Sequence, residues 1–118
     1  MITEEMFNEL KLKNIVYATV DTQDLPVIYF DKASRTCILK CFIDVKAAKE
    51  YLEFLKTMRS FKPGQIFDTN SFTTESVWTL AKTLTQKTKN RVILEVWGSN
   101  GDVDIGPFIL YDSTELPN

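Results

Sequence analysis

The stretch TCILKCFI, residues 36–43, constrains the fold more than any other part of the chain. It is rich in β-branched and apolar residues and has the length of a typical strand. Side chains alternate between the two faces of a strand. One face would therefore be entirely apolar, formed by Cys37, Leu39, Cys41 and Ile43. Because such a face must be covered, we expect this strand to belong to a sheet packed against a helix.

The two cysteines of this strand are the only ones in the chain, which has no histidine. In a strand, residues four positions apart lie roughly 13 Å from each other. A disulfide requires Cα atoms within about 7 Å, and two ligands of one zinc ion at about 2.3 Å each must also lie closer together. We therefore predict that Cys37 and Cys41 are buried free thiols, as in a reducing compartment, and we expect no metal or other cofactor.

Three helices are expected from hydrophobic periodicity and capping residues. The clearest covers residues 45–58, where apolar residues recur with a period near 3.6 and Asp44 can cap the N-terminus. A second helix is predicted over residues 74–88. A short amphipathic helix is predicted over residues 3–12.

Four further strands are expected, near residues 14–21, 25–32, 91–97 and 103–111. The short connections among the first three strands of the chain predict an antiparallel meander. Asn100–Gly101 predicts a tight hairpin between the last two strands, and Gly106–Pro107 predicts a bulge or an edge position.

Together these elements predict one α+β domain over residues 1–118. It would hold a mainly antiparallel five-stranded sheet, with two helices packed on one face and a short N-terminal helix. A chain of 118 residues is long enough to bury such a core without a disulfide or a metal.

Charge and hydropathy argue against two classes of partner. The net charge of −2 does not favour nucleic acid or an anionic membrane. The N-terminus begins with acids, and no stretch approaches the roughly 18 apolar residues of a membrane span, so we expect a cytoplasmic protein. Basic residues gather between Lys82 and Arg91, and only acids follow from Glu95 onward. This asymmetry fits a solvated surface or a complementary charge pair used in assembly.

Residues for catalysis are few. Without histidine, the chain has no Ser–His or Cys–His nucleophile pair, and it lacks the glycine-rich phosphate loops. The stretch NGDVDIG resembles the start of a calcium loop, but Ile105 stands where that loop needs glycine. Asp21, Asp24 and Asp31 lie in expected turns, where aspartate is common.

Aromatic residues outside the regular elements are the better candidates for a site. Phe61, Phe67 and Phe72 lie in an irregular connection and either fold back over the core or contact a partner. Trp97 lies beside the expected hairpin turn, and tryptophan is frequent at interfaces. The candidate partner-binding residues are Phe61, Phe67, Trp97, Asn100 and Asp102.

A resemblance to a known family rests on residues 16–56 and 66–84. The first segment combines a Val-Tyr strand, a Leu-Pro-Val strand, a strand ending in Phe, and an acid-capped helix with Ala48 and Tyr51-Leu52. The second, IFDTNSFTTESVWTLAKTL, has a short strand leading into a helix. This pattern is similar to the bacterial SseB family and to the soluble intermembrane-space translocon component of plastids. The resemblance implies a non-enzymatic α+β protein that handles other proteins, and it supplies no site residues.

These observations favour a non-catalytic protein-binding or assembly module whose partner is another protein, with homodimerisation left open. The alternative is a small inhibitor or accessory factor, for example phage-encoded, that blocks a host protein machine. An enzyme that uses carboxylates without histidine ranks third.

Overall fold

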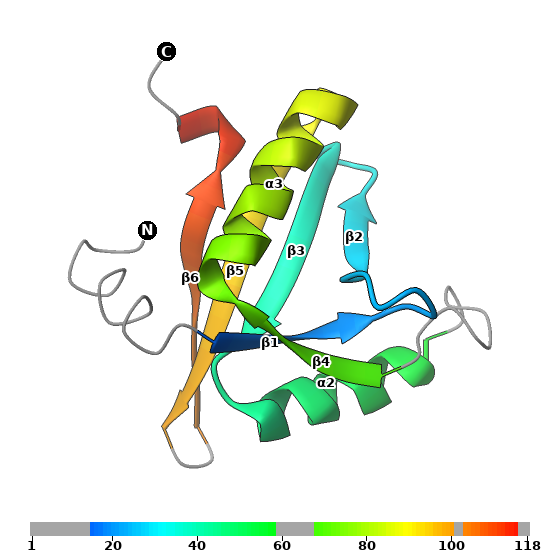
Figure 1. The fold of residues 1–118 in the computed structure, drawn as a ribbon, viewed down its shortest axis with the longest axis vertical. Helices are drawn as coiled ribbons and strands as arrows, with labels where there is room; N and C mark the ends of the chain where they lie inside the picture. The colour runs from blue at the N-terminus through cyan, green and yellow to red at the C-terminus, as the bar shows by residue number, and fades with distance from the viewer. Residues whose placement is uncertain (1–14, 59–67, 101–102, 116–118) are drawn as a thin grey trace.

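The computed structural model describes residues 15–58, 68–100 and 103–115. Its elements, shown in Figure 1, are the strands β1 (Ile15–Val20), β2 (Ile28–Asp31) and β3 (Thr36–Phe42), the helix α2 (Val45–Lys56), the strand β4 (Asp68–Thr73), the helix α3 (Thr74–Thr88), the strands β5 (Arg91–Asn100) and β6 (Val103–Asp112), and a final 3-10 turn, η1 (Ser113–Glu115). The helix predicted over residues 3–12 lies outside the described residues.

The described strands form one mixed sheet in the order β4-β1-β3-β5-β6, and β2 also pairs with β3. Most pairings are antiparallel, as predicted, but β3 and β5 run parallel along their shared register from Thr36–Arg91 to Phe42–Trp97. The expected count of five strands is wrong, because the described residues form six. The parallel pair arises because the chain leaves β3 through α2, passes along β4 and returns through α3, so that it enters β5 in the direction of β3.

The predicted antiparallel meander of β1, β2 and β3 is confirmed for the β2–β3 connection and not for the β1–β2 connection. β2 and β3 form the expected antiparallel hairpin, whereas β1 meets the segment before β2 at the isolated bridge Val20–Pro26. β1 instead pairs with β4 along the whole of that strand. β4, with the sequence DTNSFT, is polar and largely exposed. It therefore lacks the apolar alternation by which a strand is detected in a sequence.

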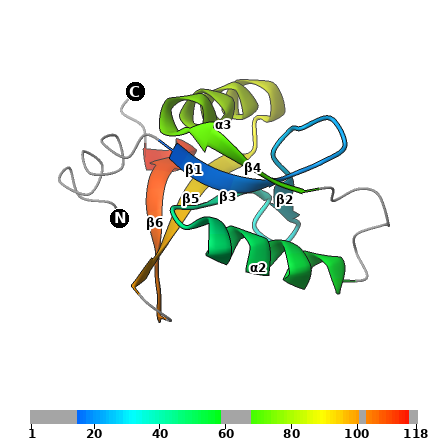
Figure 2. The same ribbon diagram turned by 60° about the horizontal axis from the view of Figure 1, so that its bottom comes forward.

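The two helices cover opposite faces of the sheet (Figure 2), so the expectation that both pack on one face is wrong. α3 contributes Val77 and Ala81 to the core that includes both cysteines. α2 lies on the other face, where its Tyr51 ring lies 5.3 Å from the ring of Phe42, centroid to centroid. The alternation along β3 explains this arrangement, because Phe42 and Cys41 point to opposite faces.

Both helices begin at side-chain caps. The Asp44 carboxylate accepts a hydrogen bond from the Lys46 N–H at 3.0 Å, as predicted. At the start of α3, the Thr73 hydroxyl accepts one from the Ser76 N–H at 3.1 Å. In both cases the side chain satisfies a backbone donor of the first turn, which has no partner within the helix.

The expectation for the two cysteines is confirmed. Both thiols are free and buried. Burial raises the pKa of the Cys41 thiol to about 12, which keeps it protonated and unreactive.

The last hairpin also follows its sequence signals. β5 and β6 pair antiparallel up to Asn100–Val103. The register shifts between Val96 and Gly98, opposite the Gly106–Pro107 dipeptide of β6. β6 is an edge strand of the sheet, so the bulge and the edge position that this dipeptide suggested are both present.

Candidate functional site

A group of aromatic residues surrounds one lysine on the sheet face that α2 partly covers. Lys40 and Phe42 belong to β3, and they are the register partners of Glu95 and Trp97 on β5. Tyr51 reaches the group from α2. We call these five residues the Lys40 cluster: Lys40, Phe42, Tyr51, Glu95 and Trp97.

The ammonium of Lys40 lies over three of these rings. Its Nζ atom is 4.3 Å from the ring centroid of Tyr51, 4.5 Å from that of Trp97 and 5.6 Å from that of Phe42. At these distances the negative faces of the rings attract the cation. The side chain of this lysine therefore joins β3, β5 and α2.

Hydrogen bonding and burial fix the rest of the cluster. The indole N–H of Trp97 donates to Oε2 of Glu95 at 3.2 Å, which orients the ring. Burial, and then the nearby Glu95 and Tyr29, raise the pKa of Tyr51. Trp97, Tyr51 and Lys40 are all half-buried, whereas Phe42 is buried, so the cluster reaches from the core to the surface of the protein.

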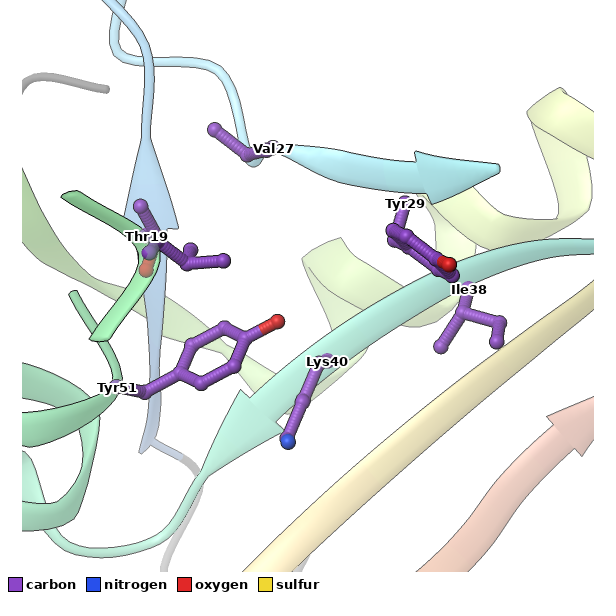
Figure 3. Close-up of a pocket in the computed structure, with 7 residues that line it drawn as sticks. Thr19, Val27, Tyr29, Ile38, Lys40 and Tyr51 are labelled. Atoms are coloured by element: carbon purple, nitrogen blue, oxygen red, sulfur yellow. The ribbon is translucent and has the colours of Figure 1, made fainter. Parts of the chain in front are cut away.

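A shallow pocket opens beside this cluster, in the fork between β1, β2 and β3 (Figure 3). It arises because β1 and β2 lie along the same side of β3 and diverge from each other. The Tyr51 hydroxyl points into the fork. About 300 Å³ of empty space, including open solvent, lies between the lining residues, which are Thr19, Val27, Tyr29, Ile38, Lys40, Tyr51 and Leu55. We call this the fork pocket.

One polar atom in the fork pocket has no partner among the described residues. The Thr19 hydroxyl is buried and makes no hydrogen bond, and Thr19 is only 4% exposed. A buried hydroxyl without a partner is unfavourable.

The chemistry of this face suits binding more than catalysis. The candidate carboxylates are used in turns: Asp21 accepts hydrogen bonds from the Gln23 and Leu25 N–H groups, and Asp31 accepts one from the Ser34 hydroxyl. Within residues 15–58, 68–100 and 103–115, no group of three or more histidine, cysteine or acidic side chains could hold a metal ion.

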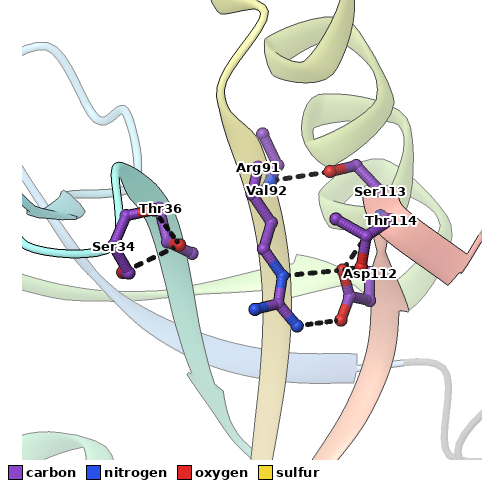
Figure 4. Close-up of polar contacts among 7 residues, drawn as sticks. All are labelled: Ser34, Thr36, Arg91, Val92, Asp112, Ser113 and Thr114. Carbon is purple, nitrogen blue, oxygen red and sulfur yellow. Dashed lines mark hydrogen bonds and ion pairs between the residues drawn. The ribbon is translucent and has the colours of Figure 1, made fainter.

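A second polar cluster joins the start of β5 to the end of β6 (Figure 4). The Arg91 guanidinium donates to both carboxylate oxygens of Asp112, with its Nε atom at 3.1 Å. The Thr114 N–H and hydroxyl donate to the same carboxylate. The Arg91 bonds contribute most, followed by those of Thr114, and together they lower the pKa of Asp112 to about 2 despite its burial.

This pair bears on the charge asymmetry of the sequence. Arg91 ends the basic segment and Asp112 belongs to the acidic one, and the two meet within one chain. Here the complementary charges stabilise the C-terminal part of the fold.

The predicted site residues fall into different parts of the molecule. Trp97 lies in the Lys40 cluster, whereas Asn100 ends β5 beside the hairpin turn. Phe61, Phe67 and Asp102 lie outside the described residues. Phe72, from the same irregular connection, packs against the core.

Sequence reasoning missed Lys40, Tyr51 and Glu95 as site residues. Tyr51 looked like part of the apolar stripe of a helix, and Lys40 like the polar member of a mixed strand face. Only the register Lys40–Glu95 and the position of α2 bring them together.

Neither of the described helices, α2 and α3, combines the length and the hydropathy of a membrane span. No protein-family model and no curated protein matches the sequence.

Two solved structures share the fold. One is Anabaena Tic22, described as a protein of protein transport, with a TM-score of 0.54 and 12% identity over 87% of this chain and 50% of that one. The other is Tic22 from Plasmodium falciparum, with a TM-score of 0.54 and 15% identity over 77% of this chain and 45% of that one. The chain therefore spans about half the length of the structures that it resembles.

These matches support the plastid-translocon side of the resemblance, at the level of fold. Neither structure is an SseB protein, so the bacterial half of that resemblance stays a prediction.

Proposed function

We propose that this chain is a protein-binding module without a catalytic step, and that its partner docks on the sheet face formed by the Lys40 cluster and the fork pocket. The observation that carries the proposal is the Lys40 cluster itself. Large aromatic side chains usually fill a core, and here two of them, Tyr51 and Trp97, stand half-exposed beside one cation over the buried ring of Phe42. Aromatic and cationic side chains on a partly exposed surface are typical of residues that dominate protein interfaces.

The arrangement would provide both affinity and selectivity. Trp97 and Tyr51 are already held in place by Lys40 and Glu95. A partner would therefore lose little side-chain entropy on these two residues. The fork pocket beside them has apolar residues and two tyrosines, Tyr29 and Tyr51, that carry hydroxyl groups. A few polar groups in an apolar pocket are the usual means of orienting a bound group.

The structural comparisons support the same class of function. The two similar structures belong to Tic22 proteins, one of them described as acting in protein transport. A role in transport or assembly would require contact with other polypeptides. Homodimerisation and a cytoplasmic location stay predictions. A small inhibitor of a host machine would use a surface of the same kind, so the identity of the partner would separate that alternative.

The test compares two tryptophans on opposite faces of the sheet. Trp97 lies in the Lys40 cluster, and Trp78 lies on α3 with the Nζ atom of Lys82 at 5.1 Å from its ring. The two are chemically matched, since each is half-buried beside a lysine. We propose affinity capture from the cells that produce the protein, using the wild type, Trp97→Ala and Trp78→Ala, with quantitative mass spectrometry.

At least one polypeptide should be captured by the wild type and by Trp78→Ala, and its recovery should fall about tenfold with Trp97→Ala, the loss expected for one interface anchor. Circular dichroism would show that both variants are folded. Equal recovery with the two variants would contradict the placement of the site. Light scattering on the same samples tests homodimerisation, since one chain has a mass of 13.6 kDa.

A further inference from the structure

We infer that the outer edge of β2 accepts an extended segment of the partner polypeptide as an additional strand of the sheet. This inference rests on the proposed function and specifies how part of the partner would bind. Addition of a peptide to an exposed sheet edge uses backbone hydrogen bonds for affinity and side-chain contacts for selectivity.

The sheet topology leaves this edge without a neighbour among the described strands. β2 pairs with β3 along all four of its residues, from Ile28–Leu39 to Asp31–Thr36. Farther along the same side of β3, β1 carries β4 on its outer side. β2 has no such strand within the described residues, and Figure 1 shows it at the margin of the sheet.

The side chains of β2 distinguish it from the other edges. Tyr29 is 48% exposed and Phe30 is 42% exposed. The strand register places Tyr29 beside Ile38, on the face of the fork pocket, and Phe30 beside Cys37, on the opposite face. Proteins usually protect an edge strand by keeping it short, or with charges, proline or a bulge. β2 is short and ends in Asp31, but its outer side has no neighbour among the described strands and it presents an exposed aromatic ring on each face, whereas β4 is polar and the pairing of β6 is bulged near Pro107.

The length of the edge favours a short peptide segment over a second copy of the chain. A strand of four residues offers few outward backbone groups, and a stable dimer usually requires about 1,000 Å² or more of buried surface. An extended segment needs only those few hydrogen bonds and a contact with each aromatic ring. Its apolar side chains would lie toward Tyr29 and Phe30 alternately, because successive side chains of a strand point to opposite faces.

Charges at the two ends of β2 further specify the segment. The exposed Lys32 and Arg35 lie in the turn after the strand, where the carboxylate of Asp31 is already hydrogen-bonded to Ala33 and Ser34. The exposed Asp24 lies in the loop before the strand. A segment of about four apolar residues with an acidic group at one end and a basic group at the other would complement both ends of β2.

The experiment uses a phage-displayed library of random peptides of about ten residues, selected on the full chain. Enriched peptides should share alternating apolar residues between opposite charges. Tyr29→Lys should weaken the binding of a synthesised enriched peptide at least about tenfold in a fluorescence titration. The matched control is Ile15→Lys, because Ile15 is a large apolar residue of β1 that is 48% exposed, as Tyr29 is, and it should change the affinity less than about twofold. Methylation of alternate peptide nitrogens should also abolish binding, since it removes the backbone donors that a ladder requires.

Failure to enrich any peptide, or equal loss of binding with Tyr29→Lys and Ile15→Lys, would overturn the inference. Either result leaves the proposed function intact if Trp97→Ala still lowers recovery of the partner about tenfold. A dimer in light scattering that Tyr29→Lys converts to a monomer would instead assign the edge to a second copy. Thermal unfolding of Tyr29→Lys would establish that the variant folds.

Discussion

At the residue scale, Lys40 determines the character of the proposed binding face. A lysine on a strand usually extends into water, but this one lies against three rings that come from three elements. The aliphatic stem of such a side chain packs against apolar surface while the charge interacts with the rings. The loss of its charge should therefore weaken both the fold and the order of the aromatic residues.

We expect Lys40→Met to lower the free energy of unfolding by about 1 kcal/mol, because methionine keeps most of the packing and removes the cation. Urea denaturation measures this loss, and near-ultraviolet circular dichroism should report a less ordered Trp97. Lys46→Met is the control, since Lys46 is exposed on α2, and its effect should stay within about 0.5 kcal/mol. Equal losses for the two variants would mean that the ring contacts of Lys40 contribute nothing to stability.

The Asp112 carboxylate makes the free energy of unfolding of the protein depend on pH in the acidic range. Its pKa falls from 3.8 to about 2 on folding, which corresponds to about 2 kcal/mol of stability. Since the charged form is the one stabilised by folding, this contribution is complete above about pH 4 and is lost as the pH falls toward about 2.

Asp112→Asn should therefore have a free energy of unfolding about 2 kcal/mol lower than that of the wild type at neutral pH. As the pH falls, the free energy of unfolding of the variant should decrease less than that of the wild type. Urea denaturation at several pH values measures both effects. The control is Asp31→Asn, because Asp31 ends β2 and, among the described residues, accepts hydrogen bonds only from its own turn. A constant difference between Asp112→Asn and the wild type from pH 7 to about pH 2 would contradict the role of the Arg91 pair.

At the element scale, the helices follow from local signals. The periodicity predicted residues 45–58 and 74–88, and the structure has Val45–Lys56 and Thr74–Thr88. Asp44 was identified as a cap because a carboxylate before an apolar-periodic run can accept a hydrogen bond from the first turn. These signals involve residues that are close in sequence, so no tertiary contact is needed to detect them.

Replacing the N-cap of α2 tests this local contribution. Asp44→Ala should lower the free energy of unfolding by about 1 kcal/mol, because the Lys46 N–H loses its acceptor. Asp44→Asn should lower the free energy of unfolding by only a few tenths of 1 kcal/mol, since asparagine is an equally good cap. Chemical denaturation compares the two variants, and an equal loss for both would point to the charge of Asp44 and not to its hydrogen bond.

β4 and the placement of α2 show where local signals fail. The sequence DTNSFT has the composition of a loop, and it becomes a strand because it pairs with β1 along its length. The apolar stripe of α2 predicted a helix that packs on a sheet, but a stripe does not specify which face of the sheet it covers. Both outcomes depend on partners distant in the sequence.

At the scale of the whole molecule, the strand edges decide how the protein meets other chains. Among the edge strands of the described part of the chain, β4 is polar, the pairing of β6 is bulged near Pro107, and β2 carries two exposed aromatic residues. Exposed apolar edges promote association between identical chains. The same feature that we propose for binding should therefore also limit the solubility of the free protein.

We expect the combined variant Tyr29→Lys, Phe30→Lys to aggregate more slowly than the wild type under mild heating, because charges on an edge strand oppose pairing with another edge. Light scattering over time measures the rate. A matched variant with the same change of charge, Val45→Lys and Phe54→Lys on exposed positions of α2, controls for net charge. If both variants aggregate equally slowly, the added charge alone accounts for the effect, and the β2 edge is not the surface through which the chains associate.

The sequence by itself determined the helices α2 and α3, the Asp44 cap of α2, the β2–β3 and β5–β6 hairpins, and the buried free thiols. Each of these depends on a period of 2 or 3.6 residues or on side chains a few positions apart, so short-range sterics and hydrogen bonding suffice. Only the tertiary structure decided the parallel pairing of β3 with β5, the pairing of β4 with β1, and the placement of the helices on opposite faces. It also assembled the Lys40 cluster from β3, α2 and β5. These features depend on how much apolar surface the whole chain buries. That area is set by contacts between residues far apart in the sequence, so no local stretch of sequence determines it.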